Sequence, residues 1–116
     1  AKIVAKNLGT EYDVLEKKRI DEYNVVIVAR KINVKNRDIV IVDDIISTGG
    51  TVIESVNALK RMGARKIIVA CTHPLLVKDA LRKIYSTGVY DLIGTNTVPS
   101  PISYISVAPV LANALK

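Results

Sequence analysis

Two kinds of hydrophobic pattern alternate along this chain. Runs of β-branched residues, such as VVIVA at 25–29 and IVIV at 39–42, are typical of strands, because Val and Ile pack well on a pleated surface. Across 51–62, apolar residues recur every three or four positions, which predicts an amphipathic helix that Gly63 ends. The whole pattern predicts strands at 12–15, 25–29, 39–42, 66–71 and 91–94, and helices at 1–8, 51–62, 77–85 and 106–115.

This alternation of strands and helices predicts the α/β class. We expect a parallel, twisted sheet covered by helices on both faces. A chain of 116 residues has the length of one domain, and no linker divides it, so 1–116 is predicted as a single domain. In such sheets, ligands bind beyond the carboxyl ends of the strands.

Composition adds three expectations. With 49% hydrophobic residues, no Trp or Phe and five Tyr, the core must be mainly aliphatic. A single cysteine, Cys71, excludes an internal disulfide and fits a reducing cytoplasm. No apolar run approaches the roughly 18 residues of a membrane span, so no membrane partner is expected.

The net charge of +6 raises the question of a nucleic-acid partner. The basic clusters carry no interleaved aromatic residues of the kind that stack bases, so we expect small anions and no nucleic acid. Three basic residues of the helix predicted at 77–85 fit a solvated helix face: Lys78, Arg82 and Lys83.

The stretch IVIVDDIISTGGT carries the clearest chemistry. Asp43 and Asp44 follow a hydrophobic strand, and their mutual repulsion must be offset by a sugar diol, a divalent cation or backbone N–H groups. Hydroxyls and glycines come next and enter a helix, which makes a site for an anion. These residues are Ser47, Thr48, Gly49, Gly50 and Thr51.

Together the two groups suit a sugar phosphate, with the phosphate in the loop and the sugar hydroxyls on the carboxylates. The alternative is a polar turn with N-capping Ser and Thr. The loop is not of the ATP-binding type, because no Gly-Lys-Ser/Thr follows the glycines.

Two weaker candidates involve His73. Cys71 and His73 are two residues apart on a strand end and invite a thiol–imidazole dyad, although no third orienting group is visible. A metal site formed by His73 with Asp79 or Asp91 is a weak candidate, because the sequence has no cluster of ligands at the spacing of a metal site. A buried cysteine and a structural histidine are the simpler interpretation.

Several stretches resemble a known family. DDIISTGGT is similar to the phosphoribosyl-diphosphate binding signature of the type I phosphoribosyltransferase fold, a Rossmann-like three-layer arrangement. VACTHPLL at 69–76 and ISVAPVLANAL at 105–115 resemble segments of ribose-phosphate diphosphokinases. VLEKKR at 14–19 falls where that family carries a catalytic Lys-x-Arg.

The resemblance implies roles for particular residues. Asp43 and Asp44 would meet the ribose hydroxyls, and the loop from Ser47 to Thr51 would hold the 5-phosphate of ribose 5-phosphate. Lys17 and Arg19 would stabilise charge on the transferred diphosphoryl group, with Arg19 also a substrate ligand. By spacing alone, these two would be an ordinary surface cluster.

The resemblance also implies a larger enzyme. Members make phosphoribosyl diphosphate and AMP from ribose 5-phosphate and ATP with Mg²⁺. They have an amino-terminal domain of the same fold, which supplies most adenine contacts, a metal-binding His and oligomer contacts. The start AKIVAKNLG lacks an initiator Met and has the pattern of a helix already under way.

We therefore expect the carboxyl-terminal half of such an enzyme. It would be inactive alone, would hold no metal ligand of its own, and would belong to a homo-oligomer in the full-length protein. The alternatives are a phosphoribosyltransferase acting on a nucleobase, and a non-catalytic module that binds sugar phosphates.

Overall fold

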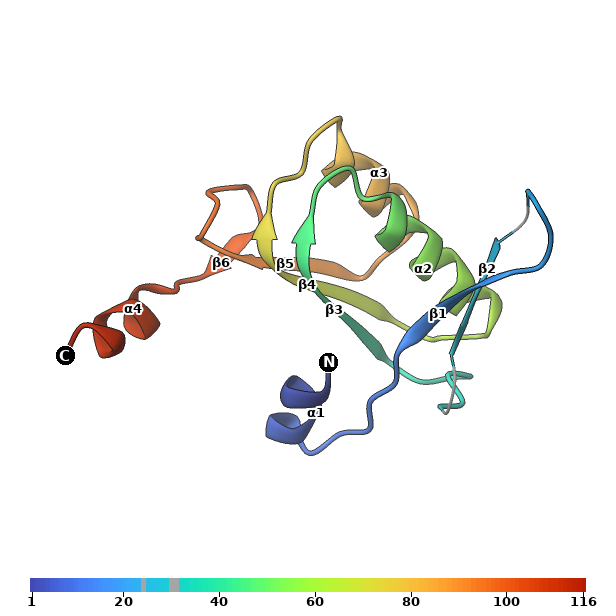
Figure 1. Ribbon diagram of the computed structural model, residues 1–116, viewed down its shortest axis with the longest axis horizontal. Helices are drawn as coiled ribbons and strands as arrows, with labels where there is room; N and C mark the ends of the chain where they lie inside the picture. Colours follow the sequence, from blue (N-terminus) through green and yellow to red (C-terminus); the bar gives the residue numbers. More distant parts are fainter. Residues whose placement is uncertain (24, 30–31) are drawn as a thin grey trace.

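A computed structural model describes residues 1–23, 25–29 and 32–116. Over these residues, the main sheet has four parallel strands in the order β3-β4-β5-β6 (Figure 1). Their bounds are β3 Ile39–Ile46, β4 Ile67–Pro74, β5 Asp91–Thr95 and β6 Ser103–Ile105. Because the strands are parallel, their carboxyl ends meet at one edge, and the α/β class is confirmed.

One face of this sheet is covered by α2 (Gly50–Arg61) and α3 (Ala80–Ser86). The aliphatic core lies between these two helices and the sheet, where Val56, Val69 and Leu92 are fully buried. Burial of such side chains stabilises the fold by about 1.5–3 kcal/mol each relative to exposure.

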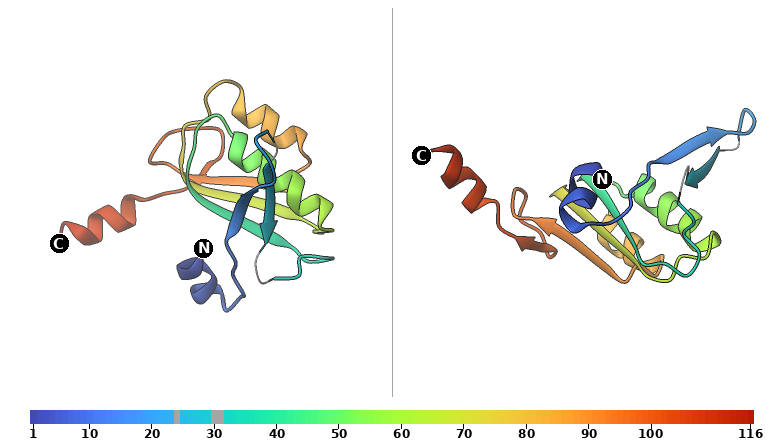
Figure 2. Two further views of the ribbon diagram at one scale, coloured as in Figure 1. Left: turned by 45° about the vertical axis from the view of Figure 1, so that its right-hand side comes forward. Right: turned by 90° about the horizontal axis from the view of Figure 1, so that it is seen from below.

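The opposite face is less covered than the pattern predicted. The short helix α1 (Lys2–Leu8) lies on this side of β3, away from α2 (Figures 1 and 2). Val40, on this face of β3, remains 50% exposed, and its neighbour Ile68 on β4 is only partly buried. Alternate residues of β3 and β4 therefore meet very different surroundings.

The first two strands form an antiparallel hairpin outside the main sheet. They are β1 (Leu15–Arg19) and β2 (Val25–Ala29), in a register that pairs Lys17 with Ile27. The predicted strand at 12–15 is thus misplaced and overlaps β1 only at Leu15. Pairing with β2, rather than the hydrophobicity of its own residues, sets the position of β1. Asn24, Arg30 and Lys31 lie outside the described residues.

Most other boundaries are shifted by a few residues. β3 continues four residues beyond its predicted end at 42, so it includes Asp43 and Asp44. α3 begins three residues later than predicted, because the residues before it, Leu76, Lys78 and Asp79, have positive φ angles.

The carboxyl-terminal segment contains one unpredicted strand. β6 has only three residues, too few for a periodic signal, and it is held by pairing with β5. After it, α4 (Ala108–Ala114) extends away from the body of the molecule (Figure 1). None of the helices in the described ranges is long and apolar enough to cross a membrane.

Candidate functional site

The predicted sugar-phosphate residues line a single hollow. It lies at the carboxyl end of β3 and the start of α2, and it encloses about 280 Å³. The structure therefore brings the two carboxylates and the hydroxyl-glycine loop together, as the sequence predicted. The lining residues are Asp43, Asp44, Ile45, Ile46, Ser47, Thr48, Gly49, Gly50, Thr51 and Val52.

The loop is shaped by Gly49, the residue just before α2. Gly49 has φ 82° and ψ 1°, a left-handed conformation that glycine adopts without strain. Its carbonyl oxygen accepts a hydrogen bond from the N–H of Ile53, and this contact starts the helix. A Cβ placed on Gly49 would lie 3.0 Å from Cδ1 of Ile84, so α3 packs directly against the turn.

The start of α2 is suited to an anion. No side chain caps this helix, and its first turn holds no acidic residue. The first N–H groups of a helix have no partner within it, and the helix dipole places partial positive charge there. The capping alternative raised by the sequence is therefore not what the geometry shows, and an anion in the hollow would meet these donors.

The two carboxylates offset their repulsion through the backbone. Oδ1 of Asp43 accepts the N–H of Asp44 at 2.8 Å, and Oδ1 of Asp44 accepts the N–H of Ile45 at 2.7 Å. Partial burial raises the pKa of Asp43, and the charge of Asp44 adds to this effect. Hydrogen bonds from the Ile45 N–H and from Asp43 lower the pKa of Asp44. Asp44 is thus the more readily ionised member of the pair.

Neither His73 alternative is supported. Burial and the charge of Asp43 raise the pKa of the Cys71 thiol, which disfavours the thiolate that a nucleophile needs. The Nδ1 atom of His73 lies 2.8 Å from Oγ1 of Thr97, so the ring has a structural partner. Asp79 is bound to Arg82 at 2.6 Å.

No cluster of three or more metal-binding side chains occurs within the described ranges. Mg²⁺ is usually held by one or two carboxylates together with waters and substrate phosphates, so Asp43 and Asp44 could supply only part of its ligands. These two residues by themselves therefore do not fit a complete magnesium site.

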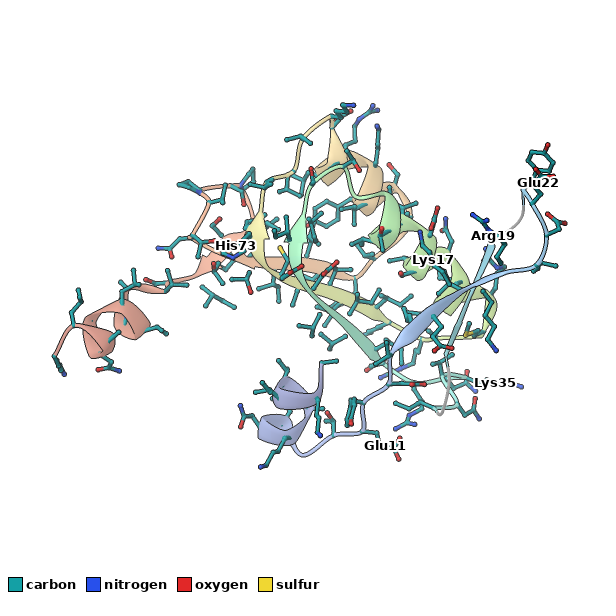
Figure 3. The ribbon with its side chains drawn as sticks, viewed as in Figure 1. Glu11, Lys17, Arg19, Glu22, Lys35 and His73 are labelled. Atoms are coloured by element: carbon teal, nitrogen blue, oxygen red, sulfur yellow. The ribbon has the colours of Figure 1, made fainter. Side chains whose placement is uncertain are left out.

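The predicted basic pair lies on the hairpin, outside the hollow. Nζ of Lys17 forms an ion pair with Oε2 of Glu54 at 2.9 Å, which places Lys17 beside α2 (Figure 3). Arg19 lies farther along β1 and is exposed (Figure 3). Glu54 was not anticipated from the sequence, because an exposed Glu in a helix has no signal that distinguishes it from any solvated residue.

Comparison with known proteins shows the family and the fold of this chain. A model of the family described as phosphoribosyl transferase domain matches residues 1–98. A ribose-phosphate pyrophosphokinase of Methanopyrus kandleri is 44% identical over 116 residues, and one of Methanothermobacter thermautotrophicus is 47% identical over 116 residues. All of this chain aligns with each, covering 40% and 41% of their lengths.

A solved structure is also similar. The phosphoribosylpyrophosphate synthetase from Mycobacterium smegmatis matches with a TM-score of 0.81 at 31% sequence identity. The match covers 98% of this chain and 39% of that one. This chain therefore spans about two fifths of the length of these relatives. With a family model matched over most of its residues, the chain belongs to the phosphoribosyl transferase domain family.

Proposed function

We propose that this chain is the ribose 5-phosphate-binding domain of a ribose-phosphate diphosphokinase, in its carboxyl-terminal half. The complete enzyme would transfer the diphosphoryl group of ATP to the anomeric hydroxyl of ribose 5-phosphate, giving phosphoribosyl diphosphate and AMP. The observation that carries the proposal is the single hollow that joins an anion loop to a carboxylate pair. The names of the relatives support the reaction.

The loop would bind the 5-phosphate. Ser47, Thr48 and Thr51 are exposed residues that line the hollow, and so do the first residues of α2. Gly50 leaves room for the ligand, because a Cβ there would meet nothing closer than Oγ1 of Thr48 at 3.9 Å. Neutral donors and a helix dipole can hold a phosphate without a fixed positive charge.

The carboxylates would bind the other end of the sugar. Ionised Asp44 offers oxygens that accept hydrogen bonds from ribose hydroxyls, and Asp43 does so once its proton has left. Their separation from the start of α2 by the loop keeps them from repelling the phosphate strongly. The sugar would therefore lie along the hollow in one direction only.

Lys17 and Arg19 would act on the transferred group. Fixed positive charges near a transferring phosphoryl group stabilise the negative charge of the transition state. Lys17 and Arg19 are two residues apart on β1, so both side chains leave the same face of the hairpin. We propose that this face turns to the bound substrates.

The complete enzyme would need components beyond this chain. Mg²⁺ is proposed as the cofactor, with ligands mainly from ATP and from another domain, and no step is derived through it. The proposed partners are ATP, an amino-terminal domain and further copies in a homo-oligomer, in the cytoplasm.

Calorimetric titration tests the binding half of this proposal. We expect the chain to bind ribose 5-phosphate, to lose that binding in Asp43→Ala and Gly50→Val, and to show little affinity for Mg·ATP. If the chain instead bound phosphoribosyl diphosphate and a nucleobase as tightly as ribose 5-phosphate, a phosphoribosyltransferase would be favoured. AMP formation by the full-length parent tests the reaction, and its absence there would overturn the assignment.

A further inference from the structure

We propose that His73 is a further substrate-binding residue, whose Nε2 atom accepts a hydrogen bond from a hydroxyl group at the sugar end of the ligand. This inference rests on the proposed function, because it assumes that a sugar phosphate occupies the hollow. It adds β4 to the site, a strand that supplies none of the residues lining the hollow.

The register of the sheet places His73 beside the hollow. His73 is the direct partner of Ile45 in the parallel pair of β3 and β4, and Ile45 lines the hollow next to Asp44. Neighbouring strands lie about 4.8 Å apart, so the imidazole side chain starts one strand away from the carboxylates. Figure 3 shows His73 at this carboxyl end of the sheet.

An electrostatic contact also joins His73 to the carboxylate pair. Hydrogen bonds from the Ile45 N–H and from Asp43 are the main causes of the lowered pKa of Asp44, and the charge of His73 lowers this pKa further. A nearby charge shifts a pKa chiefly when it lies within about 4–6 Å, which agrees with the strand register. His73 and Asp44 are therefore close enough to contact the same small ligand.

The other ring nitrogen of His73 is anchored by a threonine. Oγ1 of Thr97 donates a hydrogen bond to the carbonyl oxygen of Thr72 at 2.9 Å, and a hydroxyl group has only one proton to donate. The same Oγ1 lies 2.8 Å from Nδ1 of His73, so it must accept there, and Nδ1 carries the proton. In the neutral ring, Nε2 is then an unprotonated acceptor.

This acceptor is free to bind a ligand. Within residues 1–23, 25–29 and 32–116, no side chain or backbone group forms a hydrogen bond to Nε2 of His73. The side chain is half-buried, and its bond to Thr97 restricts the ring before any ligand arrives. Such restriction lowers the entropy cost of binding. The structural role of Nδ1 thus prepares Nε2 for a sugar hydroxyl.

Nuclear magnetic resonance tests the proposal in the unsubstituted chain. His73 is the only histidine, so its ring-nitrogen signals need no further assignment. At a pH where titration shows the ring to be neutral, we expect a protonated Nδ1 and an unprotonated Nε2. Ribose 5-phosphate should shift the Nε2 signal, whereas inorganic phosphate, which reaches only the loop, should shift it much less. An Nε2 signal that the sugar phosphate leaves unchanged would overturn the proposal.

Two substitutions separate ligand binding from structural support. In His73→Asn, the amide N–H can keep the bond to Thr97, but no atom remains at the place of Nε2. In His73→Gln, the amide oxygen can reach the place of Nε2, and the bond to Thr97 is lost. By calorimetry, we expect His73→Asn to weaken ribose 5-phosphate binding about 2- to 12-fold, and His73→Gln to weaken it less. The opposite order would indicate structural support alone and would contradict the proposal.

Inorganic phosphate is the control ligand for both variants. Its affinity should stay the same, because the loop from Ser47 to Thr51 is untouched. An equal loss of affinity for phosphate and for the sugar phosphate would mean that the substitutions disturb the loop, and the role of His73 would then be rejected.

These results distinguish the two proposals. If the unsubstituted chain binds ribose 5-phosphate but neither the Nε2 signal nor the affinity of His73→Asn responds, the role of His73 is wrong and the proposed function stands. If the chain does not bind ribose 5-phosphate, both are overturned.

Discussion

Gly49 and Ile84 are in such close contact that a Cβ on the glycine would fit only if the Ile84 side chain moved. A Cβ built there would lie 3.0 Å from Cδ1 and 3.1 Å from Cγ1 of Ile84. The Ile84 side chain is fully buried, so it cannot swing away into solvent. The turn that would bind phosphate is thereby fixed to α3, and through α3 to the core.

Gly49→Ala is expected to destabilise the domain by about 2–4 kcal/mol. The substitution adds the strain of a left-handed conformation to the cost of overpacking. Gly9→Ala is the matched control, because Gly9 has a similar φ of 66° with nothing within 4 Å of its Cβ position. Urea unfolding of both variants measures the difference, and equal losses would show that packing against Ile84 contributes nothing.

The neighbouring Gly50 should behave in the opposite way. It is the first residue of α2, where alanine is favoured over glycine by about 1 kcal/mol at most, and its Cβ position is open. Gly50→Val should therefore leave the protein folded while weakening ribose 5-phosphate binding at least about 10-fold, because the side chain projects into the hollow. Far-ultraviolet circular dichroism and calorimetry together check this, and unchanged binding would place the phosphate elsewhere.

Affinity for the sugar should rise with pH through the raised pKa of Asp43. Burial raises this pKa, so the carboxyl keeps its proton to higher pH, and only the ionised form accepts hydrogen bonds fully from ribose hydroxyls. The phosphate of the ligand also titrates, so inorganic phosphate is measured over the same range and the ratio of affinities is compared. A ratio that does not change with pH would contradict the role of this residue. So would a pH dependence of the ratio that remains in Asp43→Asn.

The same pKa has a consequence for stability. A raised pKa means that the folded state binds this proton more tightly than the unfolded state does. The carboxyl of Asp43 therefore contributes stability at pH below its unfolded pKa of about 4, and this is lost as pH rises through the folded pKa. Relative to the unsubstituted chain, Asp43→Asn should gain stability between acidic and neutral pH. Urea midpoints at several pH values measure this, and a constant difference would contradict it.

Leu92 offers a test of where the core lies. This residue of β5 is fully buried among the packed side chains of α2 and α3, so Leu92→Ala should cost about 3–5 kcal/mol. Leu115→Ala removes the same atoms from a side chain that is 87% exposed, and it should change stability by less than about 0.5 kcal/mol. Similar losses for both would mean that the carboxyl-terminal segment is covered in solution.

Local periodicity was enough to predict most of the regular elements. β2 has the predicted bounds 25–29, and α2 agrees with its predicted range to one residue at each end. Both signals are strong for physical reasons, since β-branched residues favour a pleated surface and an amphipathic repeat buries one face of a helix. The hydroxyl-glycine loop was recognisable for a similar reason, because its residue types suit a close approach of the backbone to an anion.

Elements whose positions depend on distant residues were not predictable in this way. β1 lies where its register with β2 places it, and the three residues of β6 are ordered by pairing with β5. The late start of α3 depends on positive φ angles at Leu76, Lys78 and Asp79, a conformation that residues other than glycine seldom adopt.

The sequence by itself determined the α/β class, the strand-loop-helix unit from β3 to α2, and the grouping of carboxylates and hydroxyls within nine residues. These properties are encoded by neighbours along the chain. Only the tertiary structure decided that Lys17 lies against Glu54, that Gly49 packs on Ile84, and that one sheet face stays partly open. Such contacts join residues about 35 positions apart, and they depend on how whole elements pack rather than on any local pattern.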